Sequence, residues 1–307
     1  MKLNKKKSRT LVIVVVLLAV LFVVSPNFRA SVFDYLGIEM PEKIEQTTPP
    51  APVPVGQAEV HIIDVGQGDS TLVKAGGFNL LIDAGTGKYE EKLVAYLKDV
   101  GVEKIDIMLL THPHEDHIGG ADLVIDKFEV GEIIMPDATT DTVAFERVLD
   151  GAESKNIPIS TVFRGDSFTE GGFVFDILSP DDKKYKDLNN TSIVMKLTYG
   201  DVSMMFTGDA EALVESEILD AYPKSNLKCV FLKSGHHGSS SSSTKDFVSA
   251  VEPEYVSISC GVDNDYGHPH SETLALYEKL GLDVKRTDIL GSFVYITDGK
   301  SFEPKEK

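Results

Sequence analysis

The sequence predicts an α/β fold in which strands form sheets and helices cover their outer faces. From about residue 57 onward, short apolar runs rich in β-branched residues alternate with segments of helical period. Glycine, aspartate and histidine recur just after the apolar runs, as expected where strands end at one edge of a sheet. A hydrophobic fraction of 42% in 307 residues is ample for a large core.

Residues 1–28 are expected to form a basic flank and a signal anchor or transmembrane segment. Five basic residues in the first nine positions precede fourteen unbroken apolar residues, Leu11 to Val24. Such an anchor leaves its basic flank in the cytoplasm and places the body outside the membrane. No clear small-residue cleavage site follows, so a retained anchor is expected, with cleavage and secretion as the alternative.

Residues 29–56 are expected to be a Pro-rich linker, because the run from Thr47 to Pro54 contains four prolines and should be extended and stiff. A single body then spans residues 57–307. Strands are expected at 59–65, 71–74, 78–83, 105–110, 132–135, 159–162, 173–178, 192–197, 202–206, 229–232 and 254–259, with two short ones up to 296. Helices are expected at 90–99, 121–128, 142–155, 211–221, 243–251 and 271–280.

The chain is strongly acidic, with a formal net charge of −18. Beyond the first nine positions it carries 25 basic and 48 acidic residues, a charge of −23. A body so acidic lacks the usual electrostatic footprint of a nucleic-acid binder, and no basic cluster is visible. The same carboxylates favour divalent cations. Cys229 and Cys260 lie in apolar runs and are expected to be buried thiols, with a disulfide as the alternative.

The chemistry concentrates in the loop after the strand at 105–110, which packs three histidines and two carboxylates into six residues. His112 and His114 are two apart and point the same way in extended backbone, so they can hold one ion. After the turn, Asp116 and His117 can hold a second. Asp209, which follows another strand, can bridge the two. Imidazole and carboxylate are typical ligands of borderline divalent metals.

Two further loops carry histidines at strand ends, His236-His237 and His268-Pro269-His270. One residue of the first pair should be a ligand, and His236 is taken as that ligand. His237 or His268 could then contact a substrate phosphate or protonate the leaving oxygen. Asp64 either orients a ligand or forms a turn. The serine run 239–243, beginning with Ser239, either caps the next helix or donates hydrogen bonds to phosphate.

The pattern His112-x-His114-x-Asp116-His117, with Thr207-Gly208-Asp209 downstream, resembles the metallo-β-lactamase superfamily of metal-dependent hydrolases. More narrowly, the chain resembles the hydrolase domain of the ComEC competence proteins, over about residues 57–300. The segments that carry this narrower resemblance are Asp64–Ser70, Asn189–Ser192, Ser234–Ser239, Tyr266–Pro269 and Thr287-Asp288-x-x-Gly291.

The resemblance implies an αββα sandwich with two divalent ions at one edge, Zn²⁺ first and Mn²⁺ as the alternative. It also implies that Asp69, Asn190 and Ser192 lie around the metals or the substrate. Two departures stand out. Residues 118–208 contain no histidine, although many members supply a ligand there, so one metal site is expected to be weaker, open or filled by oxygen ligands. The sequence has one apolar segment only, so a stand-alone anchored hydrolase without the multi-span channel of ComEC is expected.

The expected function is metal-assisted hydrolysis of a phosphodiester by activated water, with Asp116 or Asp209 orienting the water. DNA is the first candidate substrate, and a cell-wall phosphorylcholine or teichoic-acid phosphodiester is the alternative. A non-catalytic module of a surface complex would be expected to show broken metal motifs, and those here are intact. No stable protein partner is expected.

Overall fold

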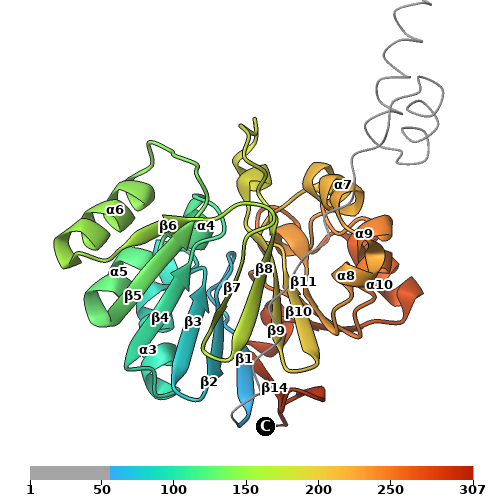
Figure 1. The fold of residues 1–307 in the computed structure, drawn as a ribbon, viewed down its shortest axis with the longest axis horizontal. Helices are drawn as coiled ribbons and strands as arrows, with labels where there is room; N and C mark the ends of the chain where they lie inside the picture. The colour runs from blue at the N-terminus through green and yellow to red at the C-terminus, as the bar shows by residue number, and fades with distance from the viewer. Residues whose placement is uncertain (1–55, 307) are drawn as a thin grey trace, which may run out of the picture.

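The computed structural model describes residues 56–306, which form two β-sheets packed face to face with helices on their outer faces (Figure 1). The layered α/β fold predicted from the sequence is confirmed. The predicted anchor and most of the linker lie outside the described residues. Within residues 56–306, no helix combines the length and hydropathy needed to cross a membrane.

The first sheet has the strand order β15-β14-β1-β2-β3-β4-β5-β6. Neighbouring strands are antiparallel from β15 to β3 and parallel from β3 to β6. Its strands are Ala58–Ile62 (β1), Thr71–Ala75 (β2), Phe78–Ile82 (β3), Lys104–Leu109 (β4), Glu129–Met135 (β5), Ile159–Thr161 (β6), Phe293–Thr297 (β14) and Phe302–Pro304 (β15).

The second sheet repeats this plan, antiparallel from β7 to β10 and parallel from β10 to β13, in the order β13-β12-β11-β10-β9-β8-β7. Its strands are Ser167–Glu170 (β7), Phe173–Ser179 (β8), Val194–Tyr199 (β9), Val202–Phe206 (β10), Phe231–Lys233 (β11), Tyr255–Ile258 (β12) and Asp283–Arg286 (β13). The sequence analysis missed β7, because its residues are polar and partly exposed, and β15.

Helices α3, α5 and α6 cover the first sheet, and α7, α9 and α10 cover the second (Figure 1). The α-helices are Glu90–Asp99 (α3), Glu115–Ile118 (α4), Ala121–Lys127 (α5), Val143–Lys155 (α6), Ala212–Ala221 (α7), Lys224–Leu227 (α8), Lys245–Val251 (α9), Ser271–Leu280 (α10) and Thr287–Leu290 (α11). Short 3₁₀ turns occur at Gly87–Tyr89 (η1), Leu188–Thr191 (η2) and Gly235–Gly238 (η3).

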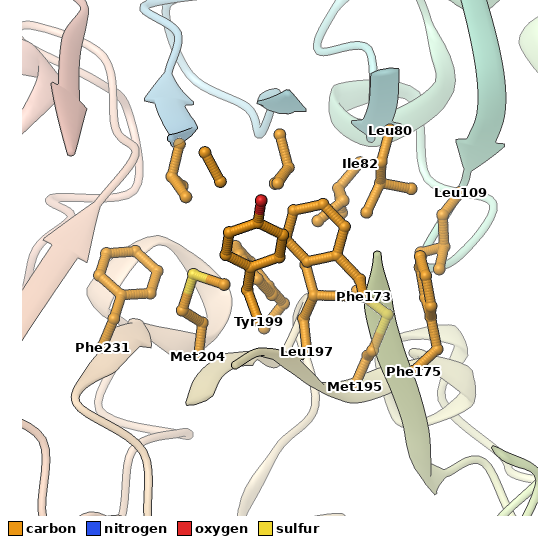
Figure 2. Close-up of a cluster of buried hydrophobic side chains, with 14 of the residues drawn as sticks. Leu80, Ile82, Leu109, Phe173, Phe175, Met195, Leu197, Tyr199, Met204 and Phe231 are labelled. Atoms are coloured by element: carbon orange, nitrogen blue, oxygen red, sulfur yellow. The ribbon is translucent and has the colours of Figure 1, made fainter. Parts of the chain in front are cut away.

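The core between the sheets is apolar and rich in aromatic rings. Figure 2 shows Leu80, Ile82 and Leu109 of the first sheet facing a row of large side chains from the second. Burying each such side chain stabilises the fold by about 1.5–3 kcal/mol, and this core sets the separation of the two sheets. Each sheet also packs against its own helices through one further apolar core. Cys229 and Cys260 are buried and unlinked, as small apolar residues would be.

Helix α7 fixes the serine loop that follows β11. Glu215 on α7 is buried, and its Oε1 and Oε2 accept the backbone N–H groups of Ser243 (2.5 Å) and Thr244 (2.8 Å). Thr244, not a serine of the preceding run, caps α9 through Phe247 N. Burial raises the pKa of Glu215 to about 7, although the two N–H donors oppose the shift.

This shift predicts a pH-dependent stability. The pKa of Glu215 is raised from 4.5 in the unfolded chain to about 7 in the folded protein. The stabilisation that protonated Glu215 gives the fold is therefore complete below pH 4.5 and is lost as pH rises through 7. The full loss corresponds to about 3 kcal/mol. We expect the free energy of unfolding, measured with urea, to fall more between pH 5 and pH 8 in the wild type than in Glu215→Gln.

The control is Glu278→Gln, an exposed residue of α10, which should keep the wild-type pH dependence. If Glu215→Gln and Glu278→Gln lose stability alike between the two pH values, Glu215 is not the titrating group.

Candidate metal centre

The candidate site lies where the carboxyl ends of the parallel strands of both sheets meet, at the top of Figure 1 near α4. The first loop follows β4 and turns into α4, with His114 at the helix N-cap. From the second sheet, Asp209 follows β10 and the His236-His237 pair follows β11. Three segments far apart in the sequence therefore converge, as their positions after strands predict.

Close backbone contact between the sheets positions Asp209. A Cβ on Gly208 would lie 2.9 Å from Thr111 Cβ, and Gly208 has φ +50°, so glycine is the residue that fits. The Thr111 carbonyl accepts the N–H of Ile193 (2.9 Å) across the sheets. The Gly208 carbonyl accepts the N–H of His236 (3.1 Å). The first loop, Asp209 and the histidine pair are thus held by one another.

Four side chains form a compact donor group: Asp116, His117, Asp209 and His237 each offer one ligand atom, and these atoms lie within 4.8 Å of one another. His237 Nε2 lies 3.1 Å from Asp116 Oδ2 and 3.5 Å from Asp209 Oδ2. All but Asp116 are buried. Two carboxylates and two imidazoles at this spacing match the ligand chemistry of a divalent cation.

Two atoms of this group are buried with no hydrogen-bond partner, His117 Nε2 and Asp209 Oδ1, although they lie 3.3 Å apart. Leaving a buried polar atom unpaired costs about 1–3 kcal/mol, so such atoms call for a partner. A cation bound between them would supply it. The donor set therefore fits the metal that its residue types predict.

The other oxygen of Asp209 faces a second set of histidines. Asp209 Oδ2 lies 3.6 Å from His236 Nε2 and 3.9 Å from His112 Nε2, and His112 Nε2 lies 2.9 Å from His114 Nδ1. Asp209 is thus placed between two sets of donors, as the predicted bridging role requires. Together they form a site that suits two metal ions.

The two histidines after β11 occupy different places in the site. His237 belongs to the compact donor group, whereas the side chain of His236 is 23% exposed and lies beside the second set. Both residues have positive φ, 49° and 54°, which turns their rings in directions that strand alternation does not predict. The geometry favours His237 over His236 as the ligand of the buried group, and His236 faces the pocket.

The imidazoles are oriented through their Nδ1 atoms. His117 Nδ1 lies 2.7 Å from Asp83 Oδ2, His237 Nδ1 lies 3.0 Å from the Ser259 carbonyl, and His236 Nδ1 lies 3.1 Å from Ser241 Oγ. An N–H donated from Nδ1 leaves the Nε2 lone pair available to a metal. In all three rings Nε2 is the atom that approaches Asp209.

Asp83 was missed by the sequence analysis. Its carboxylate also accepts Thr111 N (2.7 Å) and Thr111 Oγ1 (2.8 Å), so it ties the end of β3 to the histidine loop. Asp83 has φ +58°, and burial raises its pKa. The sequence did carry a signal for this residue. Asp83 directly follows β3 and begins the segment Asp-Ala-Gly, much as Asp209 follows the end of β10.

Lys233 was also missed, and it forms a buried ion pair beside the donor group. Its Nζ lies 2.9 Å from Asp69 Oδ2, with side chains 4% and 6% exposed. The other carboxylate oxygen, Asp69 Oδ1, lies 3.6 Å from His237 Nδ1. Asp69 was predicted near the metals, and the structure places it behind His237. The sequence signal for Lys233 was its position at the end of an apolar strand, where a lysine is unusual.

Carboxylates dominate the electrostatics of the group. Burial would lower the pKa of His237, but Asp209 and Asp69 outweigh it and raise the pKa to about 10. The pKa of His117 is raised well above its usual range against the same desolvation, by Asp209 and Asp83. Burial would raise the pKa of Asp209, but His237 and His117 hold it well below the usual range. The site therefore favours positive charge.

The remaining predicted residues divide between the site and its surroundings. Ser192 Oγ accepts the N–H of Asp209 (3.1 Å) and so supports it directly. Asp64 instead forms a turn, accepting Gly66 N (3.1 Å) and pairing with Lys92 (2.6 Å). Of the two readings of Asp64, the structure supports the turn. Ser239 lies against Ser241, whose hydroxyl reaches His236.

The side chain of Asn190 is directed at Glu211 and not at the donor group. Its Nδ2 donates to Glu211 Oε2 (3.0 Å), and its Oδ1 accepts the backbone N–H of Glu211 (3.2 Å). Its neighbour Asn189 lines the pocket, and Asn189 Oδ1 is buried without a hydrogen-bond partner. An oxygen donor is therefore available in the segment where the sequence lacks a histidine.

An open pocket of about 540 Å³ lies over the donor group. Its lining consists of Gln67, Thr86, His114, Glu115, Asp116, Thr142, Asn189, Asp209, His236, His237, Tyr266 and His268. His268 Nδ1 is buried without a hydrogen-bond partner. Burial, together with His237 and His236, lowers the pKa of His268 to about 4. His268 thus lies where the sequence analysis expected a group that contacts substrate.

The chain matches the metallo-beta-lactamase superfamily over residues 63–262, and it belongs to that superfamily. The structure is similar to that of the metallo-beta-lactamase fold protein YhfI from Bacillus subtilis, with a TM-score of 0.53 and 16% identity. That match covers 78% of this chain and 100% of YhfI, and it shows the fold alone. Family, fold and donor group together define a metal-dependent hydrolase.

Within the superfamily, the chain is related to competence proteins, as its motifs predicted. It is 33% identical over 257 residues to ComE operon protein 3 of Bacillus subtilis (strain 168), covering 78% of this chain and 33% of that protein. It is 31% identical over 247 residues to competence protein ComA of Neisseria gonorrhoeae, covering 80% and 33% respectively. The chain spans about a third of the length of these curated relatives.

The buried pair of Lys233 and Asp69 gives a stability prediction. Lys233→Met leaves the Asp69 carboxylate buried without its cation, which should cost about 3–5 kcal/mol in urea unfolding with a chelator present. Adding Asp69→Asn removes the uncompensated charge, so the double variant should lose less than the sum of the single losses.

Lys92→Met is the matched control, since its pair with Asp64 is 47% and 27% exposed and should contribute less than about 1 kcal/mol. Equal losses for Lys233→Met and Lys92→Met would contradict the role of the buried pair.

Proposed function

We propose that the protein is a metal-dependent phosphodiesterase of the ComEC-like type, most directly a nuclease. The observation that carries the proposal is Asp209, placed between two sets of imidazole and carboxylate donors at the floor of an open pocket. Two cations held about 3.5–4 Å apart are the arrangement that suits phosphodiester cleavage. The relation to competence proteins supports the same choice.

The residues divide into two sets around the carboxylate of Asp209. Asp116, His117 and His237 would hold one ion together with Asp209, and His112, His114 and His236 would surround a second. A divalent cation bound there supplies Lewis acidity, which lowers the pKa of water and draws charge from a phosphoryl oxygen. Zn²⁺ suits the imidazoles, and Mn²⁺ suits the oxygen donors.

The chain's own groups orient the reactants. Asp116 is 28% exposed, the most accessible member of the buried group, so its carboxylate can accept a hydrogen bond from the attacking water. On the pocket wall, the ring of His268 lies where it could contact a phosphate or the leaving oxygen. This assignment keeps His268 in its expected role and moves His237 from catalysis to metal binding.

Two substrate classes fit this chemistry. Nucleic acid is the first, by relation to competence proteins. A phosphorylcholine or teichoic-acid ester is the second, because no Lys or Arg occurs among the described residues that line the pocket, and an acidic wall suits a cationic head group. The basic flank and apolar run of residues 1–28 support the further proposal of a membrane-anchored enzyme with its body outside the cytoplasm.

The proposal predicts metal-dependent turnover. The full-length chain loaded with Zn²⁺ or Mn²⁺ should hydrolyse bis(p-nitrophenyl) phosphate, and a chelator should abolish the release of p-nitrophenolate. Removing a hydrogen-bond partner of a metal ligand typically lowers activity or metal affinity about 10–100-fold. Asp209→Asn alters a proposed bridging ligand itself, so it should lower kcat/KM more than about 100-fold.

Asp64→Asn is the matched control, since that aspartate forms a turn outside the pocket, and its turnover should equal that of the wild type. Undiminished turnover in Asp209→Asn, or the absence of bound metal in the purified chain, would refute the proposal.

A further inference from the structure

Tyr266 is an exposed aromatic ring on the wall of the metal pocket. It lies in the loop between β12 and α10, and 67% of its surface is exposed although it lines the pocket with His236 and Asp209. A single exposed ring is common on a protein surface, so the position of Tyr266 in the pocket lining, and not its exposure alone, indicates a role. Neither the metal site nor the orientation of the histidines uses this ring.

The loop that carries Tyr266 is held in one conformation by its own hydrogen bonds. Asn264 Nδ2 donates to the carbonyls of Gly261 (2.9 Å) and His268 (2.6 Å), and Asn264 Oδ1 accepts His268 N (2.9 Å). Gly267 N donates to Asn264 O (3.2 Å), which closes a turn around Tyr266. A ligand that binds the ring therefore loses little free energy to ordering of the loop.

The ring stacks on His268, and most of its surface remains exposed. The centroids of Tyr266 and His268 lie 5.7 Å apart with an interplanar angle of 22°, and His268 lies 5.4 Å from His236 and 6.1 Å from His237. A row of rings thus leads from the donor group to the mouth of the pocket. Because His268 covers one side of Tyr266, the exposed area belongs mainly to the opposite side.

We propose that Tyr266 is a stacking platform for a nucleobase of a nucleic-acid substrate whose phosphate lies at the metal centre. The inference rests on the proposed phosphodiesterase function and specifies its substrate class. Base stacking on an aromatic ring contributes affinity for every base without sequence preference. It would add to the affinity that bound cations give for one phosphate, since the described lining of the pocket offers no Lys or Arg to bind the rest of the nucleic-acid backbone.

The competing ligand for such a ring is the quaternary ammonium of a phosphorylcholine ester. Such cations are recognised by cages of several aromatic rings. Tyr266 is the only Phe, Tyr or Trp among the described residues that line the pocket, and its neighbours in the row are imidazoles. A single near-parallel stack suits a flat base better than a compact cation.

The test compares three p-nitrophenyl esters that differ only in the second phosphate substituent: thymidine 5′, methyl and choline. The full-length chain is loaded with Zn²⁺ or Mn²⁺, and wild type, Tyr266→Ala, Tyr266→Phe and Val262→Ala are assayed. Val262 is the control, because it is 71% exposed in the same loop but is not part of the pocket lining. A binding arm measures calorimetric affinity for single-stranded oligothymidylate and for an abasic oligomer of equal charge.

We expect Tyr266→Ala to lower kcat/KM for the thymidine ester about tenfold more than for the methyl ester, mainly through KM. The same variant should remove the preference for oligothymidylate over the abasic oligomer. Tyr266→Phe and Val262→Ala should match the wild type in both measurements.

Equal losses on the thymidine and methyl esters, or no binding preference for bases in the wild type, would overturn the inference while leaving the phosphodiesterase intact. A selective loss on the choline ester would assign the ring to a cationic head group instead. If no ester is hydrolysed, the proposed function fails, and the binding arm alone decides whether Tyr266 contacts bases.

Discussion

The structure depends on one buried carboxylate, Asp209, held where the two sheets meet. Its backbone N–H binds Ser192, the preceding Gly208 packs against Thr111, and the Gly208 carbonyl holds His236. These contacts join loops from both sheets, so the donor group exists only if the sheets pack at the right separation. The large apolar side chains of the central core set that separation (Figure 2). The packing of the core therefore determines how the donor side chains from the two sheets are placed relative to one another.

Around Asp209 the chain concentrates like charge and then compensates for it locally. Asp69, Asp83 and Asp116 each lie within 3.6 Å of an imidazole of His117 or His237. Several buried carboxylates would repel one another without positive charge. Lys233 neutralises Asp69 on the far side of His237, which leaves the charge of Asp209 and Asp116 directed at the pocket. A few carboxylates thus concentrate negative charge at this site, and one balancing cation, Lys233, is buried beside them.

Much of this arrangement could be predicted from the sequence, because strand order places chemistry at strand ends. The six helices predicted from periodicity all occur, and Asp116, His117 and Asp209 lie together as their positions after β4 and β10 suggested. What could not be predicted was the direction of individual side chains. His236, His237 and Asp83 have positive φ, and no apolar pattern encodes that choice. The sequence could therefore not settle which of His236 and His237 joins the buried donor group.

The absent histidine between the first loop and Asp209 has a structural counterpart. The segment Leu188–Thr191 folds as a short 3₁₀ turn, in which Asn190 is committed to Glu211 while Asn189 faces the pocket with an unpaired oxygen. An amide oxygen is a harder and weaker donor than imidazole. The set formed by His112, His114, His236 and Asp209 therefore gains no imidazole from this segment, and it borders the open side of the pocket. A donor set of this kind favours an ion that tolerates oxygen ligands and exchanges them readily, at the position where a phosphate would enter.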